Sequence, residues 1–189
     1  MLRRLVTAAE AALVDPACGT ERARAEAMRP AMAALLADDE PIAEQACQPL
    51  QGAAVGNLLY ADPERRFHIL AVVFPEGTSS GVHWHGCWGL IGYLRGGDEE
   101  TRYRWDGEQP VEVSRHVWHQ GDITTLLPEE DEGWHRVRNP GPGTGVSIHV
   151  LCRTPADHPH RFWDRDRRQV VDFPFREAAP GRWRAELAP

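Results

Sequence analysis

Residues 77–96 read GTSSGVHWHGCWGLIGYLRG, an apolar stretch punctuated by glycines that carries two histidines one residue apart. Because side chains at positions i and i+2 of a β-strand point to the same face, His83 and His85 are predicted to lie side by side. Imidazole is the commonest protein ligand for transition metals, but two ligands hold an ion only loosely. A metal site therefore needs a further ligand, and His135 is the candidate.

The length and composition fit one globular domain. The chain has 189 residues, 42% of them hydrophobic and 26% charged, with a formal net charge of -7. This length supports a full core, and the negative charge disfavours nonspecific attraction to nucleic acid or to an anionic membrane surface. We expect a single domain over 1–189, divided into a helical segment (1–50), a barrel core (55–155) and a C-terminal extension (156–189).

The first fifty residues are alanine-rich, and apolar positions recur there at helical spacing. They predict two or three helices, punctuated by Pro16, Pro30 and Pro41 and packed on one side of the remaining chain. From Val55 onward, short runs rich in β-branched and aromatic residues alternate with turn signals, among which GDEE (97–100) is taken as a turn. The fold class predicted is mostly β, an antiparallel barrel with N-terminal helices.

Two further features bear on the ends of the chain and its compartment. The residues from Arg153 onward suggest an extended tail over the barrel, with a short strand near Val170. The four cysteines are widely spaced without a CxxC pair, which is typical of a reduced intracellular protein. The N-terminus lacks the continuous apolar run of a signal peptide, and no stretch has the length of a membrane span. We expect a cytoplasmic monomer or small homo-oligomer without a membrane or nucleic-acid partner.

The histidine motif resembles the first signature of the cupin superfamily. The run Gly77, His83, His85, Gly89, Gly96 matches it, except that the usual glutamate ligand is replaced by Gly89. The second signature is echoed, with altered spacing, by Gly121, Pro128, Gly133, His135 and Asn139. The resemblance implies a cupin barrel, a double-stranded β-helix or jelly roll, with a metal held by His83, His85 and His135.

A three-histidine face without a carboxylate is similar to that of the cupin thiol dioxygenases, which include cysteine dioxygenase and bacterial 3-mercaptopropionate dioxygenase. The resemblance implies an Fe(2+) cofactor and an oxidoreductase that uses both atoms of O2 to convert a small-molecule thiol to its sulfinic acid. It also implies catalytic roles for Ser147 and His149, which match the first two members of that family's Ser-His-Tyr relay. Leu151 stands where the tyrosine is expected, and a leucine cannot donate a hydrogen bond.

The substrate-recognition residues depart from the family. Asn57 stands where cysteine dioxygenases carry a carboxylate-binding arginine, and the nearest arginines after the Ser-His strand are Arg153 and Arg161. Trp88, like other tryptophans beside the motifs, offers an aromatic face. These four residues are the candidates for substrate binding. They suggest a thiol other than cysteine, either one like 3-mercaptopropionate or a thiol-imidazole such as ergothioneine. Ergothioneine carries a cationic group, and it is favoured by the acidic residues near the predicted rim of the barrel, which are Asp62, Glu129, Glu130, Asp131 and Glu132.

Two alternatives stay open: a non-catalytic cupin that binds a small ligand, and a cupin dioxygenase acting on a non-thiol substrate. The remaining histidines are interpreted as structural, since a lone histidine in a strand usually is; they are His68, His116, His119, His158 and His160.

Overall fold

The computed structural model describes residues 1–127, 133–158 and 160–185. The N-terminal segment is helical, as predicted, with α1 (Leu2–Val14), η1 (Pro16–Cys18), α2 (Glu21–Leu36) and η2 (Glu44–Cys47). The Thr20 hydroxyl caps α2 by accepting a hydrogen bond from the Ala23 N–H. Pro30 does not end a helix as the sequence suggested, because it lies inside α2, which continues past the missing N–H.

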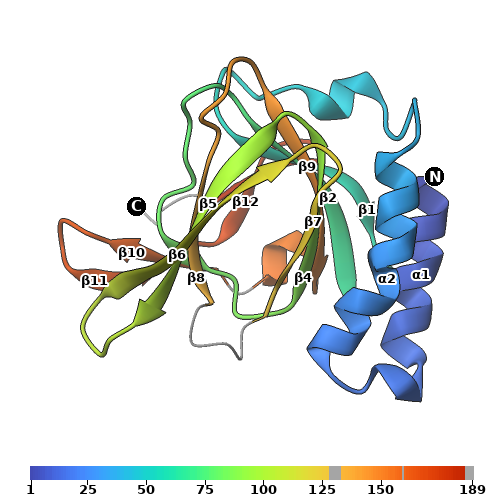
Figure 1. The fold of residues 1–189 in the computed structure, drawn as a ribbon, viewed down its shortest axis with the longest axis horizontal. Helices are drawn as coiled ribbons and strands as arrows, with labels where there is room; N and C mark the ends of the chain where they lie inside the picture. Colours follow the sequence, from blue (N-terminus) through green and yellow to red (C-terminus); the bar gives the residue numbers. More distant parts are fainter. Residues whose placement is uncertain (128–132, 159, 186–189) are drawn as a thin grey trace.

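The rest of the described chain forms two antiparallel sheets (Figure 1). The first has the order β12-β13-β1-β2-β9-β4-β7 and the second the order β11-β10-β3-β8-β5-β6. The strands are β1 (Val55–Ala61), β2 (Phe67–Phe74), β3 (His83–Trp84), β4 (Gly89–Arg95), β5 (Gly97–Trp105), β6 (Pro110–His119), β7 (Ile123–Leu126), β8 (Trp134–Arg138), β9 (Gly145–Cys152), β10 (Arg161–Asp164), β11 (Gln169–Asp172), β12 (Phe175–Ala179) and β13 (Arg182–Ala185); a further short turn, η3 (Pro155–Asp157), follows β9. The predicted class, a mostly β barrel with N-terminal helices, is confirmed.

The helices cover the outer face of the seven-stranded sheet, where α2 packs on β4 and β7 (Figure 1). Met28, Met32 and Leu35 of α2 are fully buried in the core that the helices and this sheet share. The helix approaches the sheet closely at Gly92, since a Cβ at that position would lie 2.6 Å from the Met32 sulfur. A side chain at position 92 would therefore force the Met32 side chain of α2 to shift.

Two segments differ from the expectation. The GDEE run is part of the long strand β5, because Gly97–Trp105 pairs with β6 along one edge and with β8 along the other. The described part of the C-terminal extension contributes β10, β11, β12 and β13 to the two sheets, with β11 at the predicted position of Val170. In the part of the chain described, none of the helices is both long and apolar enough to cross a lipid bilayer.

Candidate metal centre

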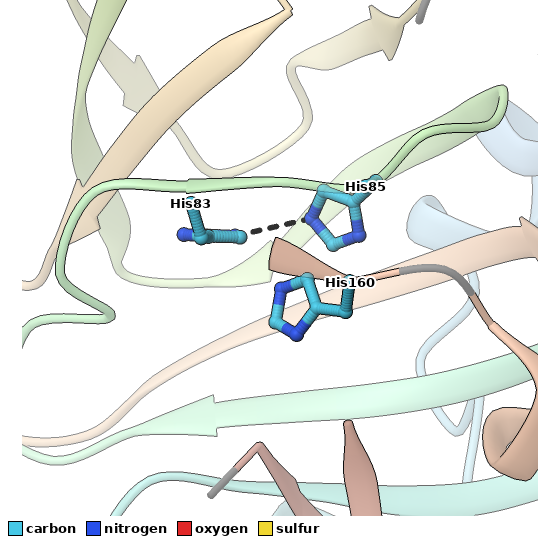
Figure 2. A group of neighbouring side chains, drawn as sticks. All are labelled: His83, His85 and His160. Atoms are coloured by element: carbon cyan, nitrogen blue, oxygen red, sulfur yellow. Dashed lines mark hydrogen bonds between the residues drawn. The ribbon is translucent and has the colours of Figure 1, made fainter. Parts of the chain in front are cut away.

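Four buried histidines gather where β10, β3 and β8 run side by side. His83 lies on β3 directly opposite His135 of β8, His85 follows β3, and His160 immediately precedes β10. Figure 2 shows His83, His85 and His160 facing one another across a small space. The ring centroids of these three lie 4.8–4.9 Å apart in each pair, and the His135 ring lies 4.4 Å from His83 and 5.2 Å from His85.

The donor atoms of His83, His85 and His160 all lie within 4.8 Å of one another, a spacing that suits ligands of one metal ion. The Nε2 atoms of His83 and His85 are 3.1 Å apart (Figure 2). His135 presents a buried Nε2 that has no hydrogen-bond partner, and the same is true of His160. A buried, unpaired ring nitrogen is costly unless something occupies it.

The Nδ1 atoms of three of these rings are committed to acceptors. His83 donates from Nδ1 to the Gly81 carbonyl at 3.1 Å, His160 to the Phe173 carbonyl at 2.7 Å, and His135 to the Glu100 carboxylate at 2.8 Å. A neutral imidazole has one N–H, so each of these rings keeps a lone pair on Nε2.

His85 acquires the same tautomer through a second histidine. The Nδ1 of His158 lies 3.2 Å from the Cys152 carbonyl, which can only accept a hydrogen bond. His158 therefore has a free lone pair on Nε2, and this atom accepts the Nδ1–H of His85 at 2.7 Å. Two lone pairs, those of His83 and His85, then face each other at Nε2, an arrangement that a cation between the rings would stabilise.

Burial keeps the rings of His83, His85 and His160 neutral. Burial and the neighbouring imidazoles His135 and His160 lower the pKa of His83 well below its ordinary value, and burial acts in the same direction on the pKa of His85. Burial lowers the pKa of His160 to about 3. Neutral imidazole is the form that binds transition metals, so the donor set fits a metal of the iron, cobalt or zinc type.

Glu100 is the carboxylate that contacts the histidine cluster, through its hydrogen bond with His135, but it does not face the space between the rings. Burial opposes its ionisation, but the hydrogen bond from His135 and the neighbouring Arg102 guanidinium lower the pKa of Glu100 to about 2. Its other oxygen accepts a hydrogen bond from the Trp118 indole at 2.9 Å. A carboxylate on the far nitrogen of a ligand histidine fixes the tautomer and the orientation of that ring.

A cavity of about 320 Å³ opens onto His83, His85, His135 and His160. Most of its other lining is apolar, and it includes Val72, Phe74, Val137, Leu151, Phe173, Phe175 and Trp183. Among the described lining residues, Arg184 is the only arginine, and no lysine, aspartate or glutamate is present. A larger cavity of about 570 Å³ lies between the segment 36–47 and the barrel, but no histidine lines it, so the chemistry belongs to the smaller one.

The predicted catalytic pair lies beside this cluster. Ser147 and His149 share one face of β9, and the Ser147 hydroxyl lies 2.9 Å from His149 Nε2. His149 lines the cavity, and burial lowers its pKa to about 3. Leu151, in the tyrosine position of the resemblance, pairs across the sheet with Gly89. A Cβ at Gly89 would lie 2.7 Å from Leu151 Cδ2, so the leucine occupies the space that a side chain at position 89 would need.

The four predicted substrate-binding residues do not line this cavity, because each is engaged elsewhere. Asn57 donates from its side-chain amide to the Ala46 and Gln48 carbonyls and accepts from Arg182. Trp88 is buried in the core under the helices, and Arg161 lies over the Trp84 ring at 5.4 Å. Arg153 occupies a left-handed backbone conformation after β9, where its carbonyl accepts from His68 Nδ1.

Of the acidic residues expected near the rim of the site, only Asp62 belongs to the described part of the chain, and it does not line the cavity. Asp62 forms an ion pair with Arg66 at 2.8 Å away from the cavity lining. Glu129, Glu130, Asp131 and Glu132 lie outside the described residues.

The expectation that all four cysteines are reduced is wrong for two of them. Cys87 and Cys152 form a disulfide, because the turn before β4 and the end of β9 bring their Cα atoms to 6.1 Å. Cys18 and Cys47 are buried free thiols.

Sequence reasoning missed His160, His158 and Glu100. Glu100 has no histidine or cysteine beside it in the sequence and reaches His135 only because β5 pairs with β8. His158 and His160, by contrast, lie at positions i and i+2, the spacing that also indicated His83 and His85, and this was the available signal.

No family model matches the sequence. The structure is similar to an uncharacterised protein with a double-stranded β-helix domain from Klebsiella pneumoniae, with a TM-score of 0.46 and 15% identity over 65% of this chain and 90% of that one. It is also similar to a sugar phosphate isomerase of the cupin superfamily from Silicibacter pomeroyi, with a TM-score of 0.43 and 19% identity over 64% of this chain and 68% of that one. A third similar structure is an RmlC-like cupin from Shewanella frigidimarina, with a TM-score of 0.44 and 17% identity over 58% of this chain and 85% of that one. The fold class rests on the two sheets themselves, and none of these proteins lends this chain an activity.

Proposed function

We propose that this protein is a non-haem Fe(2+) dioxygenase that oxidises a small-molecule thiol to its sulfinic acid. The observation that carries the proposal is the set of four buried imidazoles with Nδ1 engaged in hydrogen bonds, next to an apolar cavity. His83, His85, His135 and His160 would hold the ion. A ferrous ion bound there supplies the Lewis acid at which a thiol and O2 react together.

The residues that line the cavity would position the substrate thiol and exclude water from it. The apolar walls formed by Val72, Phe173 and Phe175 admit an apolar or aromatic body and keep bulk water from the reacting sulfur. His149, held by Ser147, is the one further histidine that faces the cavity among the described lining residues. We assign it the task of holding or passing a proton at Nε2 through the serine hydroxyl.

The lining favours a thiol other than cysteine. Free cysteine carries an ammonium and a carboxylate, and burying both without partners is costly. The described lining offers no carboxylate to an ammonium group, whereas Arg184 offers a cation to an acid. The lining therefore favours a small thiol with a single acidic group, such as 3-mercaptopropionate. Ergothioneine, whose quaternary ammonium group has no N–H to satisfy and would lie against the Phe173 and Phe175 rings, is the second form to compare.

The test is oxygen uptake by anaerobically iron-loaded protein over a panel of cysteine, 3-mercaptopropionate and ergothioneine. We expect thiol-dependent uptake for at least one of the last two, and a product heavier than its thiol by two oxygen atoms. His83→Ala should abolish both. Iron-loaded protein that consumes no O2 with any thiol, while binding one of them stoichiometrically, would favour a ligand-binding role and overturn the proposal.

A further inference from the structure

A second cluster of metal-type ligands lies behind His85, outside the cavity lining. Cys87, Cys152 and His158 are all buried, and their potential donor atoms lie within 4.8 Å of one another. The His158 Nδ1 is 3.5 Å from the Cys87 sulfur, and its Nε2 touches His85. This group belongs neither to the proposed iron ligands nor to the substrate walls.

The backbone holds this cluster independently of the sulfur–sulfur bond. Cys152 ends β9, whose pairing with β2 and β4 fixes its position, and its N–H donates to the Trp88 carbonyl at 3.4 Å. His158 follows η3, and its Nδ1 lies 3.2 Å from the Cys152 carbonyl and 3.5 Å from the Cys87 sulfur, so a cation there would replace the hydrogen bond to the carbonyl. The two cysteines and the histidine therefore remain neighbours when the disulfide is opened.

We propose that reduction of the Cys87–Cys152 disulfide creates a second metal site, Cys87–Cys152–His158, that takes a thiophilic divalent cation such as Zn2+. A dithiol supplies two electrons and two protons and is oxidised to a disulfide, or a phosphine supplies two electrons while water gives its oxygen to the phosphine oxide and its two protons to the sulfurs; either way the protein disulfide becomes two thiols. Binding of the cation then releases two protons, one from each thiol, and forms two metal–sulfur bonds and one metal–nitrogen bond.

The ligand chemistry and the burial favour this occupant. Two thiolates and an imidazole are a standard donor set for zinc. A buried site tolerates little net charge, and two thiolates balance one divalent cation. Hard cations such as Mg2+ prefer oxygen donors, and the cluster offers none of the carboxylate kind.

Occupation of this site would act on His85, a consequence that rests on the proposed function. A cation on His158 Nδ1 moves the ring's proton to Nε2, which then donates to His85 Nδ1 instead of accepting from it. His85 would then carry its own proton on Nε2, the atom that faces His83. Filling the thiolate site would thus weaken the histidine site, and the weakening would be reciprocal.

The experiment uses Co2+ as a spectroscopic probe, because sulfur bound to cobalt gives a charge-transfer absorption that nitrogen ligands do not. Co2+ is titrated anaerobically into the disulfide form and into protein reduced with a phosphine that is removed beforehand. We expect the sulfur-to-cobalt absorption only in the reduced protein; in reduced His83→Ala, where the histidine site is disrupted, it should saturate at one equivalent per chain. Cys87→Ser and Cys152→Ser should abolish it, whereas Cys18→Ser and Cys47→Ser, the matched controls at the buried free thiols, should retain it.

Two further measurements separate the thiolate site from the proposed iron site and from effects of misfolding. His83→Ala removes a proposed iron ligand, so the thiolate absorption should survive in that variant even if the proposed function is wrong. In reduced wild-type protein, Zn2+ should protect Cys87 and Cys152 from alkylation, read by mass mapping, which avoids variants that misfold. No absorption after reduction, absorption that persists in Cys87→Ser, or unprotected thiols would overturn the proposal.

Discussion

The Glu100 carboxylate accepts the Nδ1–H of His135 at 2.8 Å, and both side chains are almost completely buried. This bond directs the free Nε2 of His135 toward the other histidines. Glu100→Gln keeps the shape but replaces the ionised acceptor, so we expect metal affinity to fall by about 10- to 100-fold. Calorimetric titration of the variant and of wild type with Fe2+ or Co2+ measures this affinity. Glu99→Gln, the neighbouring position on β5, should leave the affinity unchanged, and equal losses in both variants would refute the role of Glu100.

Ser147 is predicted to act on turnover and not on metal retention. Ser147→Ala removes the hydroxyl that lies 2.9 Å from His149 Nε2, so the proton at His149 loses its partner. We expect kcat to fall by roughly 10²-fold, the lower end of the range for general acid–base groups, at unchanged iron content. Oxygen uptake and metal analysis check the two quantities. Ser114→Ala on the exposed strand β6 is the control, and a Ser147→Ala protein with wild-type kcat would exclude the pair from catalysis.

The first prediction depends on Glu100, which the sequence did not reveal. The pattern of period two identified His83 and His85, and the repeated short strands indicated the β fold, since both are local properties of the chain. GDEE has the composition of a turn, but strand pairing on both sides of β5 overrides that composition and carries Glu100 to His135. His160 and the Cys87–Cys152 pair are joined by contacts between residues more than sixty positions apart, which no local pattern records.

The four expected substrate residues lie away from the cavity for a related reason. Asn57 matches the family position by its place along the chain, but its side chain faces the segment that precedes β1 and donates to the carbonyls of Ala46 and Gln48. The cavity walls include Phe175 of β12 and Trp183 of β13, from the predicted C-terminal extension, together with residues of β1, β2 and β9.

Acid should destabilise the metal-free protein in a defined window. Burial lowers the pKa of His68 to about 4, against about 6.5 in an unfolded chain. Between these values the unfolded state binds the extra proton, so the free energy of unfolding falls as the pH drops from 6.5 to 4. Each such histidine contributes a slope of about 1.4 kcal/mol per pH unit. Urea denaturation at several pH values should show a shallower slope for His68→Gln than for wild type.

The exposed residue His119 provides the control for that comparison. His119→Gln should leave the slope at its wild-type value. A slope that is the same in wild type and His68→Gln would show that His68 titrates alike in the folded and unfolded chains.

The disulfide is predicted to stabilise the barrel. Cys87 and Cys152 close a loop with a sequence separation of 65 residues. Loop-closure entropy then gives a stabilisation of about 4 kcal/mol. We expect the free energy of unfolding of the double variant Cys87→Ser/Cys152→Ser to be lower than that of wild type by about 4 kcal/mol. Guanidinium denaturation under oxidising conditions measures the difference. The same measurement on Cys18→Ser should show a smaller loss, and a double variant as stable as wild type would contradict the prediction.

The central claim is that four imidazoles bind one ferrous ion, and anaerobic calorimetric titration of the metal-free, disulfide-bonded protein with Fe2+ tests it most directly. We predict one ion per chain for wild type, and loss of at least about tenfold in affinity in each of His83→Ala, His85→Ala, His135→Ala and His160→Ala, with His116→Gln unchanged. No Fe2+ binding by the wild-type protein, or affinity that survives intact in these histidine variants, would contradict the account.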